Sequence, residues 1–398
     1  MEDVAAQWVL TAVAASLCMF VLRWKIYKAI LNSSSAVTAP NPNDPMPGKL
    51  LVVGAGCIGV TVGAVVGLNS PCEVRFLGSR KGPETDQMQS EGITLQFPEG
   101  HSRKFKPHRA LAGPEDVAAA YQGVDIILVC VKRTANADVA RDVAQHAPQG
   151  ALVCMLQNGL GAASEFKELC KRPDLVITDA VVDFNSVKLG PGQFRWVSSR
   201  DHSTVVLDGG AEVVARTRPL ASLLAQCGLD SYCDADLHGV KCGKLIVNLV
   251  NAPNALSGRT TLDMFTQAGY QVVWRASIRE AKAIMRKEGI TPRTARDREN
   301  ALVANLDKVL VFPGWALALY LKAVGRQLDG KASMLQDLEA KRMTEIDYIT
   351  GYVSAWGKSV GVPTPVSDRL ATLVHQAEVK RQGSPMLSPE ALAKACNL

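Results

Sequence analysis

Three polar residues recur at helical spacing in an otherwise apolar stretch, KLIVNLVNAPNALSG, which begins at Lys244. Lys244, Asn248 and Asn251 stand at i, i+4 and i+7, so they form one stripe along a helix. An ammonium group in such a stripe can donate a proton, and amides can orient a polar ligand without adding charge. The stripe could also face solvent, which is the commoner fate of lysine. The pattern alone leaves both interpretations open.

Glu345 is a second candidate, in the stretch AKRMTEIDYITGYVSAWG. A threonine followed by an acidic residue is typical of a helix N-terminus, where backbone N–H groups lack partners and favour negative charge. The same carboxylate could be held at a reaction site. Its local sequence fits both interpretations.

A glycine-rich turn occurs in KLLVVGAGCIGVTVGAVVGLN, where three glycines have GxGxxG spacing between an apolar run and a helical pattern. In that context the first glycine allows a tight turn, the second lets the backbone approach a pyrophosphate, and the third lets the helix pack closely on the strand. The phosphates would lie at the helix N-terminus, which attracts anions. A glycine-rich turn without a ligand is the alternative. We predict that a dinucleotide binds at Gly54, Ala55, Gly56, Cys57, Ile58 and Gly59.

The second expected strand, CEVRFLG, is followed by Ser79, Arg80 and Lys81. An NAD enzyme places an acidic residue on the ribose hydroxyls about 20 residues after the glycines. Basic residues there favour a 2′-phosphate, so we predict NADP(H), with Arg80 as the direct contact and Lys81 as its alternate. Charges of a solvated loop are the other interpretation.

Two later strands of the same α/β pattern end in polar residues: VDIILVCVK ends at Lys132, and ALVCMLQNG carries Asn158 near its end. Ligands of doubly wound sheets lie outside the carboxyl ends of the strands. Both residues are therefore candidates by position. A surface lysine and a turn-forming Asn-Gly are the alternatives.

Length and composition favour a two-domain enzyme, because 398 residues exceed one hydrophobic core. The 44 basic and 38 acidic residues give a net charge of +6 that is spread along the chain, so we expect acidic metabolites as partners and no nucleic acid. The 10 cysteines show no CxxC or Cys/His metal spacing, so we expect reduced thiols and no metal site.

The N-terminus has a different character. Residues 4–22 carry no charge and precede the basic RWKIYK, a pattern that predicts a membrane anchor over residues 1–31 with the rest of the chain facing the cytosol. A cleaved signal peptide or a mitochondrial presequence fits the flanking charges less well. The Ser-, Asn- and Pro-rich residues 32–48 predict a flexible linker, so we expect folding to begin near Lys49.

The periodicities then divide the chain. Alternating strands and helices predict a Rossmann-type doubly wound domain over residues 49–236, and helical periods predict an all-α domain over residues 237–398. We therefore expect a fold of the class α/β plus all-α, preceded by a single transmembrane helix.

Taken together, the motifs resemble the ketopantoate reductase (2-dehydropantoate 2-reductase) family, whose members are NADP enzymes with a Rossmann domain and a helical domain. The resemblance covers about residues 49–378 and rests on GAGCIG, VCVK, LQNGLG, KLIVNLVNAPNALSG, SMLQD and TEIDYITG. SMLQD with TEIDY is the most specific pair. The family's second asparagine, four residues after the one matched by Asn248, is Ala252 here, and Asn251 is its nearest substitute.

The resemblance implies roles for single residues. Lys244 would be the general acid, with Glu345 in the cleft near cofactor and substrate. Lys132 and Asn158 would hold the nicotinamide side, and Asn248 and Ser333 would hold the substrate, with Asn251 beside them.

The reaction implied is reduction of a 2-oxo acid, best represented by 2-dehydropantoate to (R)-pantoate in pantothenate biosynthesis. A paralogue that reduces another 2-oxo acid or an imine, and a silent NADP-binding sensor, are the alternatives. The segment 291–330 is longer than in compact bacterial enzymes, and we expect it to roof the cleft or to form the contact of a homodimer.

Overall fold

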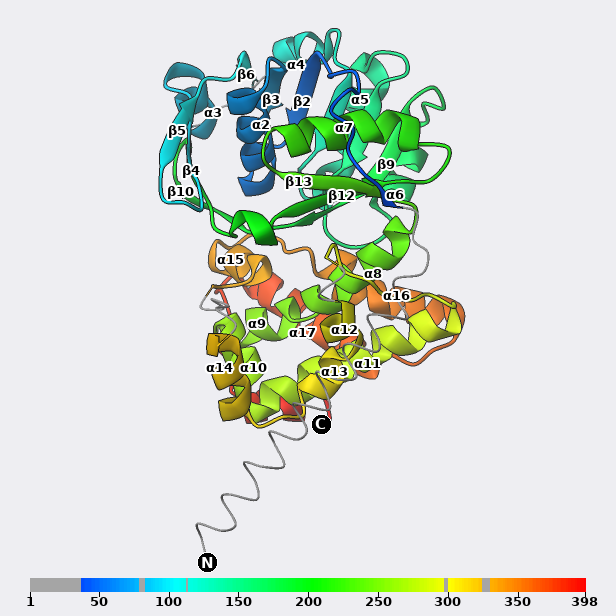
Figure 1. Cartoon of the computed structure of the whole chain (residues 1–398). Helices are drawn as coiled ribbons and strands as arrows, with labels where there is room; N and C mark the ends of the chain where they lie inside the picture. The colour runs from blue at the N-terminus through cyan, green and yellow to red at the C-terminus, as the bar shows by residue number, and fades with distance from the viewer. Residues whose placement is uncertain (1–36, 79–82, 112–113, 297–299, 324–329) are drawn as a thin grey trace, which may run out of the picture. The chain divides into compact units, whose positions relative to one another are not determined.

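The computed structural model describes residues 37–78, 83–111, 114–296, 300–323 and 330–398. Residues 37–398 form one compact unit, in which an α/β part precedes a helical part (Figure 1). The predicted anchor over residues 1–31 and the predicted contacts Arg80 and Lys81 lie outside the described residues. Among the helices of the described ranges, none has the length and hydropathy needed to cross a membrane.

A nine-stranded sheet over the described residues forms the centre of the α/β part, in the order β1-β13-β12-β9-β8-β7-β2-β3-β6. Its strands are β1 (Val37–Thr38), β2 (Lys49–Val53), β3 (Glu73–Leu77), β6 (Arg109–Leu111), β7 (Ile126–Val129), β8 (Leu152–Met155), β9 (Val176–Asp183), β12 (Thr204–Asp208) and β13 (Asp230–Asp234). The six strands from β6 to β9 are parallel to one another, and β9 pairs antiparallel with β12. Their order is that of the dinucleotide-binding doubly wound fold, so this prediction is confirmed.

The strands of this sheet are apolar on both faces because helices cover both. In β2, Leu50 and Val52 belong to one buried cluster, whereas Leu51 and Val53 belong to another on the opposite face. The helices of this part are α2 (Cys57–Asn69), α3 (Pro83–Ser90), α4 (Pro114–Tyr121), α5 (Asn136–His146), α6 (Ala162–Cys170) and α7 (Val214–Gln226).

A small second sheet has the order β10-β11-β4-β5. Its strands are β10 (Ser186–Gly190), β11 (Gln193–Trp196), β4 (Ile93–Gln96) and β5 (Ser102–Phe105). It packs on α2, since the buried Phe105 ring leaves no room for a side chain at Gly67.

Part of the predicted linker 32–48 packs against the main sheet. Strand β1 pairs antiparallel with β13, and the Asp44 carboxylate accepts a hydrogen bond of 2.7 Å from Ser222 and pairs with Arg218 at 2.9 Å. The hydrogen bond from Ser222 and the charge of Arg218 lower the pKa of Asp44 despite its burial. The expectation that folding begins near Lys49 is therefore wrong over residues 37–48, because side chains on α7 supply partners that the polar composition did not reveal.

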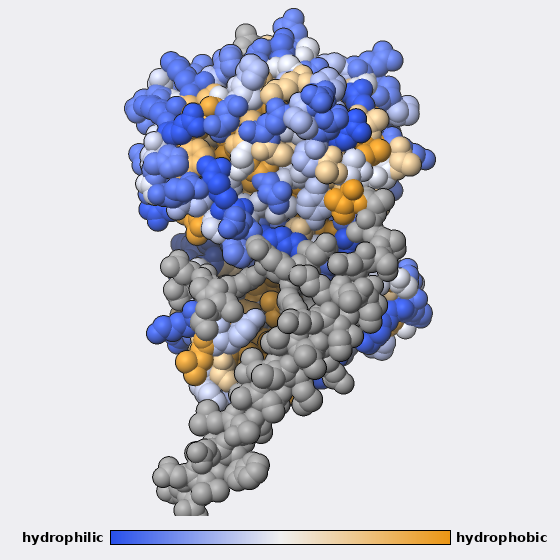
Figure 2. Space-filling view, viewed as in Figure 1, coloured by the Kyte–Doolittle hydropathy of each residue, from blue (hydrophilic) through white to orange (hydrophobic). Residues whose placement is uncertain are grey.

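The helical part follows β13. Its helices are α8 (Leu237–Asn248), α9 (Asn251–Ser257), α10 (Thr261–Thr266), α11 (Ala268–Lys287), α12 (Asn300–Ala304), α13 (Leu306–Val309), α14 (Gly314–Ala323), α15 (Ser333–Glu339), α16 (Thr350–Val360), α17 (Pro365–Lys380) and α18 (Pro389–Ala395). Hydrophobic residues reach the surface over this part (Figure 2), among them Phe312, Trp315 and Leu319 near and on α14.

One expected helix is interrupted at the candidate stripe. Helix α8 ends at Asn248, and α9 begins at Asn251 after a two-residue turn. Pro253 explains the break, because a proline has no N–H for the carbonyl four residues earlier, that of Leu249. The predicted continuous stripe is thus divided between two helices.

Gly59 provides a test of how closely α2 packs on β2. A Cβ at Gly59 would lie 2.3 Å from the Gly54 carbonyl oxygen and 2.9 Å from Val52 Cγ1, whereas a Cβ at Gly56 would meet nothing within 4 Å. We expect Gly59→Ala to lower the free energy of unfolding by about 1–3 kcal/mol through overpacking. Urea denaturation curves would measure this, with Gly56→Ala as the matched control that stays close to wild type. Equal stability of the two variants would contradict the account.

Candidate active site

The glycine turn lies at the carboxyl ends of the central strands. Gly54 has φ +109°, and its missing Cβ would lie 2.8 Å from the backbone N of Val131, just after β7. A side chain would therefore separate the turn from the neighbouring strand. The open space at Gly56 is where a pyrophosphate would approach the start of α2. The turn fits a dinucleotide for both reasons.

The Asn158 turn meets the segment that carries Glu345. Gly159 has φ +83°, and a Cβ there would lie 2.2 Å from the Tyr348 carbonyl oxygen, so only glycine lets the two backbones approach this closely. The Asn158 side chain and the Arg133 backbone lie close enough to the Glu345 carboxyl to act as donors that lower its pKa. The carboxyl ends of β7 and β8 thus converge on one glutamate.

Two further charges surround Glu345. Burial raises the pKa of the Glu345 carboxyl, the positive charge of Lys132 opposes that rise, and the negative charge of Asp337 adds to it. Lys132 itself pairs with Asp337, a buried residue of α15. Lys132 is consequently held at the site by the helical part and is no free surface lysine.

A small polar network fixes the backbone on either side of Glu345. The backbone N–H of Thr344 donates to Glu378 Oε1 at 2.7 Å, and the Thr344 hydroxyl accepts from the Ile346 N–H at 3.1 Å. His375 contacts Glu378 through Nδ1 and Asp347 through Nε2, both at 2.8 Å. Glu345 precedes a short 3-10 turn, Ile346–Tyr348, and α16 begins only at Thr350. The Glu345 carboxylate therefore lies at the start of a short turn that is fixed by hydrogen bonds, and not in the first turn of α16.

Lys244 lies at the carboxyl end of β9. Its Nζ donates to Asp183 Oδ1 at 2.9 Å, and Arg296 pairs with the other oxygen of Asp183 at 2.8 Å. The Lys244 side chain is about one-quarter exposed. Gly243 explains how Arg296 reaches this place: a Cβ there would lie 1.7 Å from the Arg293 carbonyl oxygen, so the loop before Arg296 runs directly against α8.

A second ion pair lies one helical turn away. Lys241 on α8 pairs with Asp179 on β9 at 2.7 Å, and only 5% of its side chain is exposed. Burial lowers the pKa of Lys241, and the Asp179 carboxylate opposes that shift. Two aspartates of one strand therefore hold two lysines of one helix.

The proposed substrate residues are brought together only in part. Asn248 donates through Nδ2 to Asn158 Oδ1 at 3.4 Å, which joins the stripe on α8 to the turn after β8. Asn251 is buried, and Ser333 is exposed at the start of α15. The loop before Ser333 is fixed by Asn254, whose side chain accepts from the Ala332 N–H at 3.1 Å. Among the described residues, neither Asn251 nor Ser333 has a side-chain hydrogen bond to Asn248 or Lys244.

Sequence reasoning missed Asp183, Arg296 and Asp337. Asp183 ends a parallel strand, so the rule that favoured Lys132 and Asn158 applies to it as well. Asp337 stood within the motif SMLQD without being assigned a role. Arg296 carried no local signal, because only the packing of its loop on Gly243 brings it to the site.

His375 provides a pH test of the network behind Glu345. Burial lowers the pKa of His375, but its hydrogen bond to Glu378 and the charge of Asp347 outweigh that effect, so the net pKa is raised above 6.5. A raised histidine pKa stabilises the fold fully below the unfolded pKa, and the contribution is lost as pH rises through the folded pKa.

We therefore expect His375→Gln to lower stability more at pH 6 than at pH 9. The difference should be about 1 kcal/mol or less, since the side chain is 41% exposed and solvent screens its charge interactions. Denaturant curves at both pH values measure it, with His108→Gln at an exposed site as the control. A stability loss that grows with pH would contradict the sign.

Comparison with known proteins identifies the family of the chain. The family model "Ketopantoate reductase PanE/ApbA" matches residues 50–207, and its C-terminal companion matches residues 236–378. A 2-dehydropantoate 2-reductase of Mycobacterium tuberculosis is 27% identical over 82% of this chain and 97% of its own, and one of Halobacterium salinarum is 24% identical over 83% and 99%.

Solved structures show the same fold. A PanE/ApbA family ketopantoate reductase of Ralstonia eutropha has a TM-score of 0.67 and 25% identity, and covers 84% of this chain and 99% of its own. A D-mandelate dehydrogenase solved with NADH and anilino(oxo)acetate has a TM-score of 0.69 and 21% identity over 84% of this chain and 99% of its own. Since the two family models match both the α/β and the helical part, the chain belongs to the ketopantoate reductase family of NADPH-using oxidoreductases.

Proposed function

We propose that this protein reduces a 2-oxo acid to the 2-hydroxy acid with NADPH, and that 2-dehydropantoate, which yields (R)-pantoate, is the first substrate to test. The observation that carries the proposal is the bond between Asn248 and Asn158 at 3.4 Å. It joins the helix of Lys244 to the turn that holds Glu345, at the carboxyl ends where a dinucleotide binds. Relatives that bear the name 2-dehydropantoate 2-reductase support the choice of substrate.

The residues of the chain have separate tasks in this reaction. Bound NADPH supplies the hydride that reduces the ketone carbon. Negative charge then develops on the ketone oxygen, and Lys244 both stabilises that charge and donates a proton from Nζ. Asp183 orients the Lys244 ammonium by accepting from it at 2.9 Å. Because the ammonium is already oriented, no reorientation of this group is needed when charge develops on the ketone oxygen.

The amides and Glu345 hold the two ligands. Asn248 offers a neutral donor one turn from Lys244, where it can orient a polar group of the acid. Asn158 accepts from Asn248 through Oδ1, and its side chain also favours the charged form of Glu345, so one residue lies between the substrate side and the cofactor side. We assign Lys132 to the nicotinamide side and Asn251 and Ser333 to the substrate, as the family resemblance implies.

A different 2-oxo acid is the second candidate, and Ala252 favours it. This residue is fully buried where the family has a second asparagine, so one polar contact to the substrate is missing. A catalytically silent NADP-binding sensor is less well supported, because Lys244, Asn248 and Glu345 stay within one connected polar network.

Turnover by the full chain tests the function directly. We expect NADPH oxidation with ketopantoate, and weaker activity with NADH. NADPH oxidation is measured by continuous recording of absorbance at 340 nm, in parallel for ketopantoate, pyruvate, 2-oxoisovalerate and 2-oxoglutarate. Tight NADPH binding without oxidation with any 2-oxo acid would exclude the reductase and leave the sensor.

Replacement of Lys244 tests the mechanism. We expect Lys244→Ala to lower kcat by roughly 10² or more while NADPH binding stays near normal, because the lost group donates the proton and lies on the substrate side. Steady-state kinetics and NADPH fluorescence titration measure both quantities, with the exposed Lys358→Ala as the control. An unchanged kcat would remove Lys244 from the role of general acid.

Location and assembly form part of the same proposal. The anchor over residues 4–22 with a cytosol-facing enzyme rests on the sequence alone. Membrane association that resists carbonate in the full chain and is lost without residues 1–36 would support it. We also propose that the chain forms a homodimer, since a structural neighbour from Staphylococcus aureus is described as a dimeric ketopantoate reductase.

A further inference from the structure

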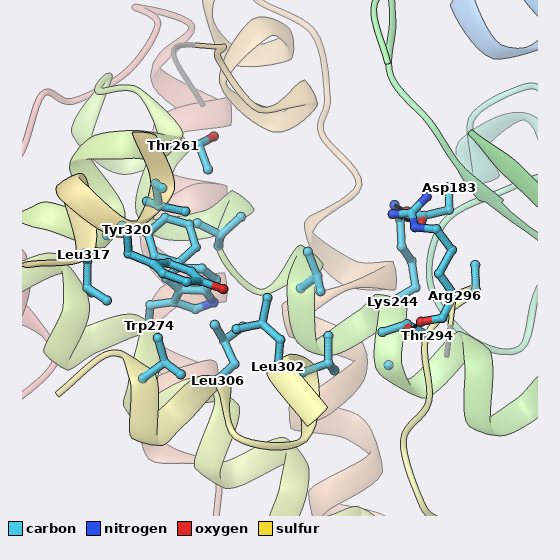
Figure 3. A pocket seen from close by; sticks show the side chains of 18 of the residues that line it. Asp183, Lys244, Thr261, Trp274, Thr294, Arg296, Leu302, Leu306, Leu317 and Tyr320 are labelled. Carbon is cyan, nitrogen blue, oxygen red and sulfur yellow. Dashed lines mark hydrogen bonds and ion pairs between the residues drawn. The ribbon is translucent and has the colours of Figure 1, made fainter. Parts of the chain in front are cut away.

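A cavity of about 170 Å³ opens beside Lys244 on the helical part. Its apolar wall includes Phe265, Trp274, Leu306, Leu317 and Leu321. Figure 3 shows this wall on one side and the side chains of Lys244, Asp183 and Arg296 on the other. The cavity is therefore apolar over most of its surface and charged at the end where the proposed acid lies.

The cavity is distinct from the polar face of α8 that carries Asn248. Its lining includes Gly243, Lys244 and Val247, which lie on an adjacent face of the helix, and Val250 in the turn after it. It does not include Asn158, Asn248, Ser333 or Glu345, all of which are described residues. Lys244 belongs to both faces, so a ketone at its ammonium lies at the mouth of the cavity.

The wall is buried and its rim is accessible. Trp274 is 1% exposed and Leu306 is 4% exposed, whereas Val247 and Tyr320 at the lining are 37% and 40% exposed. A void among large apolar side chains normally destabilises a fold, because the residues around it lose packing contacts. Trp274 also buries its indole N–H without a hydrogen-bond partner. The void is unfavourable for the protein alone, and a ligand that fills the space restores the missing packing contacts.

The size of the cavity indicates the kind of group that fits. An apolar protein cavity of about 150 Å³ is known to hold one benzene molecule. The volume of about 170 Å³ thus suits one aromatic ring or a branched chain of similar size. Such a group is less polar than the side chain of ketopantoate, which carries a hydroxyl group.

Helices α12, α13 and α14 build much of this wall, since Leu302, Leu306, Leu317 and Tyr320 come from them or from their ends. These helices fall within the segment 291–330 that was expected to roof the cleft or to form a subunit contact. The described part of the segment packs over the cavity beside Lys244.

We propose that the cavity is the side-chain subsite of the 2-oxo acid, and that it takes an aromatic or long branched apolar group. The proposal rests on the reductase function proposed above and names its substrate class. The ketone then lies at Lys244, and the apolar group extends between Val247 and Trp274.

The first test compares substrates with the full chain. We expect kcat/KM with phenylpyruvate and with 4-methyl-2-oxopentanoate to exceed that with pyruvate at least about tenfold and to equal or exceed that with ketopantoate, since each buried methylene is worth about tenfold or more in specificity. NADPH oxidation is recorded for all four acids.

The second test fills the subsite. Val247→Phe places a ring at the accessible rim, and Val379→Phe is the matched control because Val379 is 83% exposed on α17. We expect Val247→Phe to lower kcat/KM for phenylpyruvate about tenfold or more while pyruvate changes less than about threefold. The substrate comparison on the unmodified protein stands even if this variant fails to fold.

The outcomes separate the two proposals. A kcat/KM for ketopantoate or pyruvate that clearly exceeds the kcat/KM for phenylpyruvate and 4-methyl-2-oxopentanoate would overturn the proposed subsite and leave the reductase function standing. Equal losses for all acids in Val247→Phe would also overturn it, since the substitution would then act on Lys244 and not on the side chain. NADPH binding without turnover of any of the four acids would overturn the reductase, and the subsite with it.

Discussion

The site depends on how α8 is fixed to β9. Asp179 and Asp183 alternate with apolar residues on one strand, and they pair with Lys241 and Lys244 on one helix at 2.7 and 2.9 Å. Both ion pairs can form because residues four apart on a strand lie on one face of the strand, and residues three apart on a helix lie on one face of the helix. Removing one partner from a buried pair typically costs about 3–5 kcal/mol, since the other charge stays buried alone. The deeper pair at Lys241 therefore fixes the helix, and the shallower pair at Lys244 leaves its side chain partly exposed, as the proposed role of general acid requires.

A second contact, between the turn after β8 and the segment that carries Glu345, brings further polar residues close to α8. Gly159 lets the Tyr348 backbone approach the turn after β8, and Asn158 then reaches both Glu345 and Asn248. Lys132 is drawn to the same region by Asp337 on α15. Segments more than 150 residues apart in the sequence thus share one polar network, as the separation of Asn158 from Glu345 shows.

The apolar cavity and the polar network meet at Lys244. The network supplies neutral and charged donors, while the cavity supplies a contact area that is apolar over most of its surface. This division is that of most small-molecule sites, in which few polar groups fix the orientation and apolar walls provide much of the affinity.

The sequence by itself determined the glycine turn, the doubly wound order and the helical character of the second part, because these follow from local spacing and from short-range apolar periods. It also placed Lys132, Asn158, Lys244 and Glu345 among the candidates. It did not determine which acid pairs with Lys244, how residues 37–48 pack, or where α8 ends.

These features were decided by the tertiary structure. Asp183 and Arg296 meet Lys244 only because a loop passes over Gly243, and Asp44 finds its partners on a helix far along the chain. Ion pairs, cavities and close backbone approaches join residues that are distant in sequence, so their energies have no local signature and are fixed only when the elements pack.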